Sequence, residues 1–186
     1  LLDTFLAACK THGWIKPRGT QRTDSTHVLA AIRRLYYLEC VQEALRHALN
    51  QLSAVNAPWV QQHVPVAWYE RYGPRAEVGR FPKEASKRDA LALQIGADGY
   101  HLLEWLGADE HADDLRRLPA VEVLRQMWVQ HYYRCTVPGL ETLRWRRTDE
   151  QPPAALLIQS PYDVDARYSQ KRETQWVGYK VHLSET

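Results

Sequence analysis

A long run of apolar residues at helical spacing constrains this chain more than any other feature. The apolar positions recur at steps of three, four or their sums: Val28, Ile32, Leu35, Val41, Leu45, Leu49 and Leu52. Residues at this spacing line one face of an α-helix. The pattern predicts an amphipathic helix of roughly six to seven turns. Polar residues fill its other face, among them Arg33, Arg34, Gln42, Glu43 and Arg46, and we expect the three arginines to be solvated.

Further helices are expected before and after this run. Leu1 to Cys9 has helical spacing and Gly13 follows it. A second helix is predicted over 83–106, weakened or kinked at Gly96 and Gly99, and a third from Pro119, a favourable first-turn residue, to about Tyr133. The stretch 57–82 is rich in proline and aromatic residues, which predicts short helices and turns. Four tryptophans are expected in the core rather than stacked on bases: Trp59, Trp68, Trp105 and Trp128.

Strand signals concentrate near the end of the chain. The two best candidates are 154–159 and 176–183, and the polar segment 21–26 is a third. The stretch 137–153 between helix and strands is expected to be turn-rich and basic. The order of elements is a helix, a strand, a helical block of about 130 residues and then further strands. This order predicts an α+β protein, mainly helical, with an insertion between parts of one sheet.

Composition excludes several classes of protein. The chain is 45% hydrophobic and 25% charged, which is typical of a globular domain rather than a disordered one. A net charge of +2 permits nucleic-acid binding without arguing for it. The three cysteines are far apart and form no CxxC pair, so a disulfide framework or zinc site is not expected and a cytoplasmic location fits better. No apolar run is long enough to cross a membrane.

Three segments resemble one family, the bacterial insertion-sequence transposases of the DDE type. They are Gln21-Arg22-Thr23-Asp24-Ser25-Thr26-His27-Val28-Leu29-Ala30, Ile95-Gly96-Ala97-Asp98-Gly99-Tyr100, and Ser160-Pro161-Tyr162-Asp163-Val164-Asp165-Ala166-Arg167-Tyr168-Ser169 with Lys171-Arg172 and Trp176-Val177-Gly178-Tyr179-Lys180-Val181-His182 after it. The third is the most specific, whereas the segment around Asp24 alone would be a weak signal. Their order and spacing fit the family along nearly the whole chain.

The resemblance implies a partial RNase H-like domain with a large helical insertion between its first strands. On this interpretation, residues 1–27 hold the N-terminal helix and first strand, 28–153 the insertion, and 154–186 the return to the truncated sheet. Asp24 would be the first catalytic acid and a metal ligand, and 178–182 would form the following strand. The family uses Mg²⁺, or Mn²⁺ in its place, to cleave DNA and transfer strands.

The resemblance also limits what this chain is expected to do alone. Family members carry a second Asp and then a Glu, and no residue here matches those positions. Leu1 lies within an apolar stretch, and 176–186 is strand-like, so both ends are expected to be cut from a longer protein. We therefore expect an internal fragment that is inactive alone and binds no metal. Its partners in the full-length form would be DNA, at the element's ends and at the target site, and further transposase copies. No membrane partner is expected.

Two acidic positions have structural alternatives. Asp24 stands in Thr23-Asp24-Ser25-Thr26, and all of these residue types can cap the predicted helix that follows. Asp163 and Asp165 would share one face of a strand and could bind a cation. In a turn led by Pro161 they would instead bond their own backbone, which we consider the better interpretation.

Basic residues are the candidates for contact with DNA. Lys180 and His182 alternate with apolar residues on the last predicted strand, and Lys171 and Arg172 precede it. A further group is Arg144, Arg146 and Arg147, which combine cations with Trp145, a mixture suited to nucleic acid. For Lys180 and His182 a plain polar sheet face is an equal alternative, whereas a short surface run like the arginine group is more often simply solvated. The alternative function is a module without chemistry, a transposase remnant that contacts DNA or other subunits.

Overall fold

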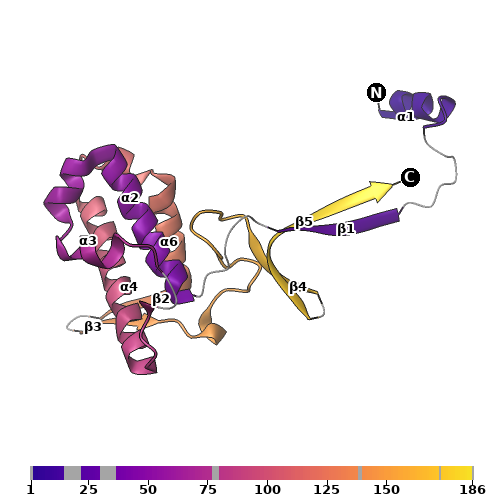
Figure 1. Cartoon of the computed structure of the whole chain (residues 1–186). Helices are drawn as coiled ribbons and strands as arrows, with labels where there is room; N and C mark the ends of the chain where they lie inside the picture. The colour runs from indigo at the N-terminus through magenta and orange to yellow at the C-terminus, as the bar shows by residue number, and fades with distance from the viewer. Residues whose placement is uncertain are drawn as a thin grey trace.

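The computed structural model describes residues 2–14, 22–29, 37–76, 80–137, 140–171 and 173–185. The fold is α+β and mainly helical, with two small antiparallel sheets, which confirms the predicted class. Figure 1 shows three parts. The helical body holds the helices and the hairpin between residues 37 and 145, and the arm is the sheet of β1 (Arg22–Leu29), β4 (Arg167–Lys171) and β5 (Thr174–Glu185). The helix α1 (Leu2–Thr11) lies beyond the far end of the arm.

The first long helix of the body, α2 (Tyr37–His63), begins later and extends further than predicted. Val28 and Leu29 end the strand β1 instead of opening a helix, and residues 30–36 lie outside the described part. The helix kinks at Asn56 (φ −147°, ψ 77°). The Asn56 side-chain oxygen accepts a bond from the Trp59 N–H at 3.0 Å and so caps the second part. Pro58 is tolerated there because the first N–H groups of a helix have no helical partner.

The helix α4 (Ala85–Ala108) is continuous, so the kink predicted at its glycines is wrong. A Cβ on Gly96 would lie 2.4 Å from the Tyr132 ring, and one on Gly99 would lie 2.1 Å from the Trp128 ring. The indole N–H of Trp128 donates to the Gly96 carbonyl at 2.9 Å. The two glycines therefore let α6 and the strand after it approach α4 closely.

The predicted helix at Pro119 is confirmed as α6 (Pro119–His131), preceded by α5 (Asp113–Arg116). The short helix α3 (Ala67–Tyr72) packs on α2. Of the four tryptophans expected in the core, Trp59, Trp68 and Trp128 are buried, and Trp105 is half-buried against the same cluster. The core of the body thus joins α2, α4 and α6 through large apolar side chains.

The region after α6 differs from the prediction in two ways. A hairpin, β2 (Tyr132–Val137) and β3 (Leu140–Trp145), opens what was expected to be a turn-rich stretch. Tyr132 and Trp145 are cross-strand partners with ring centroids 5.0 Å apart, and β2 is rich in strand-favouring residues. The strand predicted over 154–159 is wrong, because this segment forms turns. Its apolar residues Leu157 and Ile158 are buried as single side chains, not as one face of a strand.

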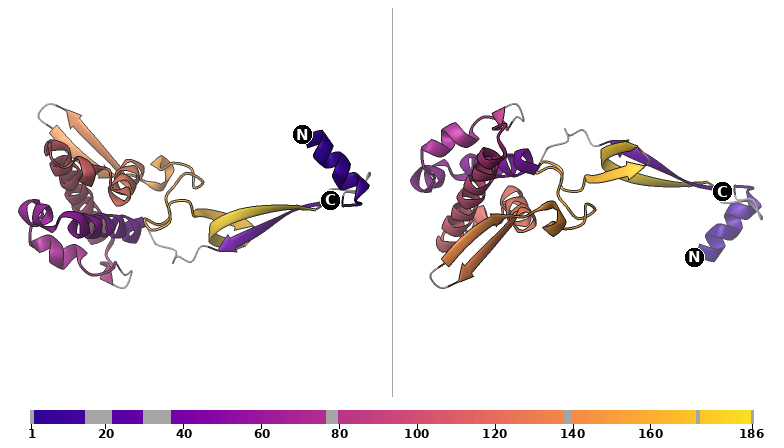
Figure 2. Two further views of the ribbon diagram at one scale, coloured as in Figure 1. Left: turned by 90° about the horizontal axis from the view of Figure 1, so that it is seen from above. Right: turned by 90° about the horizontal axis from the view of Figure 1, so that it is seen from below.

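The arm is a three-stranded antiparallel sheet in the order β1 (Arg22–Leu29), β5 (Thr174–Glu185), β4 (Arg167–Lys171). The predicted strand over 176–183 and its pairing with the Asp24 segment are both confirmed. The first half of β5 pairs with β4 and the second half with β1, and Gly178 is paired on both sides. Both views in Figure 2 show the arm projecting from the body. The chain exposes 12647 Å², compared with about 9,200 Å² for a compact protein of this size.

Candidate functional site

Asp24 lies near the start of β1, opposite Leu183 of β5. The helix-cap alternative is wrong, because a cap bonds an N–H two or three residues on and the strand continues to Leu29. The direction of the Asp24 carboxylate lies outside the described residues. β1 stands at one edge of the sheet, so its outer side has no partner among the strands that the structure describes.

Lys180 and His182 lie on β5, beside β1, and Lys171 lies on β4, on the other side of β5. In the ladder, His182 is opposite Ser25 and Lys180 is opposite His27. Lys171 ends β4, opposite Thr174 of β5. Arg172 and the side chains of the other three are outside the described part. The strand pairing thus brings the backbones of Asp24, Lys180 and His182 into one two-stranded ladder.

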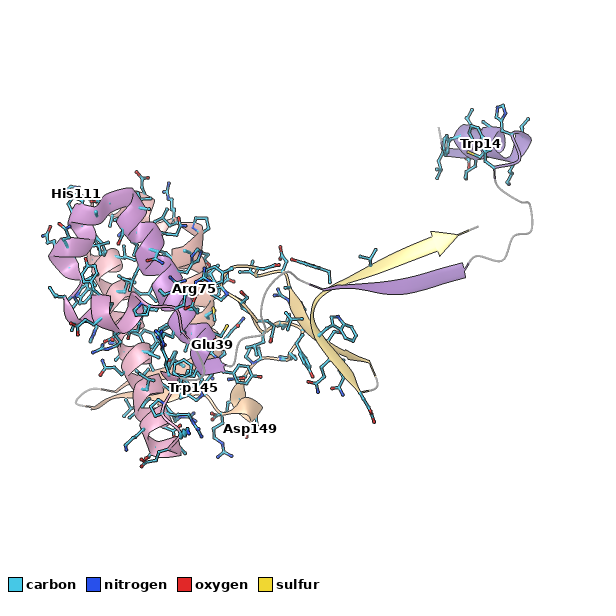
Figure 3. The ribbon with its side chains drawn as sticks, in the orientation of Figure 1. Trp14, Glu39, Arg75, His111, Trp145 and Asp149 are labelled. Atoms are coloured by element: carbon cyan, nitrogen blue, oxygen red, sulfur yellow. The ribbon has the colours of Figure 1, made fainter. Side chains whose placement is uncertain are left out.

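The second basic group is on the body and does not join the first. Figure 3 shows Trp145 and Asp149 on the body, away from the ladder of β1 and β5. The Arg144 guanidinium donates to both carboxylate oxygens of Glu150, at 2.8 and 2.7 Å. The Arg147 Nε lies 3.6 Å from an oxygen of Asp149, in the 3₁₀ turn η2 (Thr148–Glu150). Acidic neighbours therefore balance part of this positive charge.

An exposed aromatic ring lies between two cations of this group. Tyr133 on β2 is 43% exposed, and the guanidiniums of Arg144 and Arg146 lie 5.5 and 5.7 Å from the centre of its ring. Arg146 is held by the carbonyls of Val129 and Tyr132, which accept from its Nε at 3.1 and 3.0 Å. Both contacts are of the cation–π type, and Tyr133 remains open to solvent beside them. Tyr133 and Arg144 meet because they are cross-strand partners in the β2–β3 hairpin. The hairpin was not predicted, so the sequence did not indicate this contact.

Glu43 is a buried acid that the helical pattern did not predict. The solvated position expected for Arg46 is wrong, since Arg46 is half-buried. Glu43, on the same polar side of α2, is only 4% exposed. Its Oε1 accepts from Arg46 Nε at 3.0 Å and from the Ala76 N–H at 2.6 Å. Its Oε2 accepts from Arg46 Nη2 at 3.1 Å and from the Tyr162 hydroxyl. Burial raises the pKa of Glu43, but these bonds outweigh it and the pKa is lowered, so the buried carboxylate stays ionised.

Asp98, in the second transposase-like segment, is also buried. It accepts from the Tyr72 hydroxyl at 2.5 Å and from the Gln94 amide at 2.9 Å, and it forms an ion pair with Arg71. Burial and then the bond to Asp98 raise the pKa of Tyr72, which keeps this hydroxyl a donor. Both oxygens of Asp98 are bonded to neighbours, so this acid ties α3 to α4.

Of the two acids in the third transposase-like segment, Asp163 follows the turn interpretation. One oxygen of Asp163 accepts from the Ala166 N–H at 3.1 Å, and the other accepts from the Tyr179 hydroxyl of β5. Asp165 is exposed. Among the residues that the structure describes, no group of three or more His, Cys, Asp or Glu side chains could hold a metal ion.

Comparisons with known proteins add no family. The chain matched no protein-family model, no curated protein and no solved structure. None of the helices in the described ranges is both long and apolar enough to cross a membrane.

Proposed function

We propose that this chain is part of a DDE-type transposase of a bacterial insertion sequence, which cleaves DNA and transfers its strands, and that Asp24 is its first catalytic acid. The observation that carries the proposal is the pairing of β1 with β5. The resemblance calls for an acid on a first strand and for 178–182 on the next strand of an RNase H-like sheet. Two antiparallel strands with Asp24 opposite Leu183 meet that requirement.

The position of the helices also supports the proposal. All of α2 to α6 lie in the chain between β1 and β5, which are neighbours in the sheet. A helical insertion between the first strands of a partial RNase H-like domain would have this layout. The outer side of β1 would accept further strands of the same sheet, since an open strand edge readily pairs with another strand.

One carboxylate does not make a two-metal site. Mg²⁺ prefers carboxylate oxygens, and a pair of such ions stabilises the attacking and leaving oxygens of a phosphodiester. Asp24 would supply one ligand, and the described residues contain no group that completes the set. The role of Asp24 in the proposal is to hold one carboxylate on a strand rather than on a loop. The other two acids would come from beyond the described residues.

The test replaces Asp24 in the full-length enzyme encoded around this chain. Asp24→Ala and Asp24→Asn should abolish cleavage and strand transfer in Mg²⁺, and in Mn²⁺, on DNA that carries the element's ends. Asp114→Ala, at an exposed acid of α5, is the matched control and should keep activity. Transposition that survives Asp24→Ala would end the assignment. The isolated chain should cleave nothing.

A second function is favoured by the cation–π contacts on the body. The Tyr133 ring, flanked by Arg144 and Arg146, offers a surface on which an unpaired base could stack. A module that binds DNA without chemistry would use it. Fluorescence anisotropy with single-stranded DNA distinguishes this function: Tyr133→Ala should weaken binding at least tenfold, and Asp24→Ala should leave it unchanged. Equal binding by wild type and Tyr133→Ala would reject it.

A further inference from the structure

The segment 157–166, which follows the body and precedes β4, carries two hydrogen-bond anchors on adjacent residues. Tyr162 bonds to the body and Asp163 bonds to the arm. We propose that Tyr162 and Asp163 are positioning residues, a joint that fixes the direction of β5, and of Asp24 on β1, relative to the helical body. The inference rests on the proposed function only for the consequence at Asp24.

The body side of the joint is built around the buried Glu43. The Tyr162 hydroxyl donates to Glu43 and accepts from Arg46 Nη2 at 2.8 Å. The ring of His47 meets the Tyr162 ring edge-on, with centroids 4.9 Å apart. Glu43 also accepts from the Ala76 N–H at 2.6 Å, so its carboxylate is held from two parts of the body. Tyr162 therefore contacts an acid whose own position is fixed.

The residues just before Tyr162 are also attached to the body. The Ile158 N–H donates to the Gln130 side chain of α6 at 3.0 Å, and the Cys40 thiol donates to the Gln159 carbonyl at 3.5 Å. Ser160 is only 1% exposed, and its hydroxyl oxygen accepts from the Tyr162 N–H at 3.2 Å. The segment is thus held by α2 and α6 up to Tyr162.

The arm side begins one residue later. Asp163 accepts from the Ala166 N–H at 3.1 Å, which closes its turn, and from the Tyr179 hydroxyl. Tyr179 lies on β5 opposite Val28 of β1, so this bond reaches the ladder that contains Asp24. Tyr162 and Tyr179 are 47% and 37% exposed, and their hydroxyl bonds act beside the packing of Val164 on the body core and the burial of Trp176 and Val177 on β5. The hydroxyl bonds are the directional contacts among these and set the direction of the arm.

A small rotation at the joint produces a larger displacement at Asp24, which is why the joint would affect catalysis. A strand rises about 3.3 Å per residue, so Leu183 lies roughly 13 Å from Tyr179 along β5. A tilt of roughly 10° at Tyr179 would move Leu183, and Asp24 opposite it, by about 2 Å. A misplacement of about 1 Å can lower a reaction rate about 100-fold. Small freedom at the joint would thus be amplified at the acid.

The experiment measures the distance between body and arm in the 186-residue chain by pulsed electron paramagnetic resonance. Spin labels carried by an unnatural amino acid replace Val129 of α6 and Val181 of β5, which are 70% and 36% exposed. Tyr162→Phe and Tyr179→Phe each remove one hydroxyl and should at least double the width of the distance distribution. Tyr69→Phe, at a 50% exposed tyrosine of α3, is the matched control and should keep the narrow wild-type distribution.

Two outcomes separate the joint from the catalytic proposal. A narrow, unchanged distribution in either folded variant, Tyr162→Phe or Tyr179→Phe, overturns the joint, whatever Asp24 does. Broad distributions support it, and strand transfer by the full-length variants should then fall at least tenfold. If distributions broaden while full-length Asp24→Ala still transposes, the joint stands and the catalytic assignment fails. Tyr179→Phe keeps the test valid if Tyr162→Phe fails to fold.

Discussion

The helical body and the arm contain similar apolar residues but use them differently. On α6, Val121, Leu124 and Met127 are completely buried. On β5, Trp176 and Val177 are buried, whereas Tyr179 and Val181 remain 37% and 36% exposed. The body is stabilised by removal of apolar surface from water, which is the dominant favourable term in folding. The arm is a ladder of backbone hydrogen bonds with less burial to support it. Its geometry therefore depends more on single polar contacts such as those of Tyr162 and Asp163.

The difference between body and arm also separates the residues that stabilise the fold from the residue proposed for catalysis. The acid proposed for catalysis lies on the arm, and the largest buried side chains lie in the body. Sites that must meet a substrate are often drawn from the less stable parts of a protein. Substitutions in the body should therefore change the free energy of unfolding, and substitutions in the arm should change geometry and activity instead.

The largest expected effect concerns His131, which is buried in the body against Trp145. Burial lowers the pKa of His131 from 6.5 to about 4, an interval worth about 3 kcal/mol. The unfolded chain binds this proton below pH 6.5 and the folded chain does not until about pH 4. Stability should be complete above about pH 6.5 and should fall by about 3 kcal/mol as the pH decreases to about 4.

Urea unfolding of wild type and His131→Phe across this pH range checks the prediction. The phenylalanine keeps a ring against Trp145 but binds no proton, so the variant should lose this part of the pH dependence. His101→Phe, at an exposed histidine of α4, should keep it. An identical pH profile for wild type and His131→Phe would show that His131 does not carry the effect.

A smaller effect is expected where α4 meets α6. Gly99→Ala places a methyl group 2.1 Å from the Trp128 ring, and such overpacking costs about 1–3 kcal/mol. Gly107→Ala is the matched control on the same helix, because nothing lies within 4 Å of its added Cβ. Alanine favours helix over glycine by up to about 1 kcal/mol, so that variant should be slightly more stable. Thermal unfolding compares the two, and equal midpoints would contradict the close packing.

The smallest effect is expected on the arm and compares the two regions directly. Val181→Ala changes a side chain on β5 that is 36% exposed, and it should alter the unfolding free energy by less than about 0.5 kcal/mol. Val121→Ala makes the same change in the body at a fully buried position. It should cost about 1.6 kcal/mol or more, since each buried carbon contributes about 0.8 kcal/mol and a cavity adds to this. Similar losses for both variants would show that the arm is packed like the body.

Local patterns predicted part of this fold and of its candidate site. Pro119 marked the start of α6, and the alternation over 176–183 marked β5. The transposase-like segments led to the pairing of β5 with the Asp24 strand. The hairpin β2–β3 was missed, because its partner strands depend on the packing of Tyr132 and Trp145 against the core. The burial of Glu43 was not predicted, because helical spacing cannot show what covers a polar residue.

The sequence by itself determined the elements whose signals are local: the proline at the start of α6, the apolar spacing within α2, and the alternation of β5. Tertiary structure alone decided where the first long helix begins, since Val28 and Leu29 fit a helical pattern yet pair with Tyr179 and Gly178. It also decided that Gly96 and Gly99 admit aromatic rings instead of bending α4. The physical reason is that helical spacing and strand pairing compete for the same residues. Contacts with distant segments, which a local pattern does not contain, supply the free energy that selects one of them.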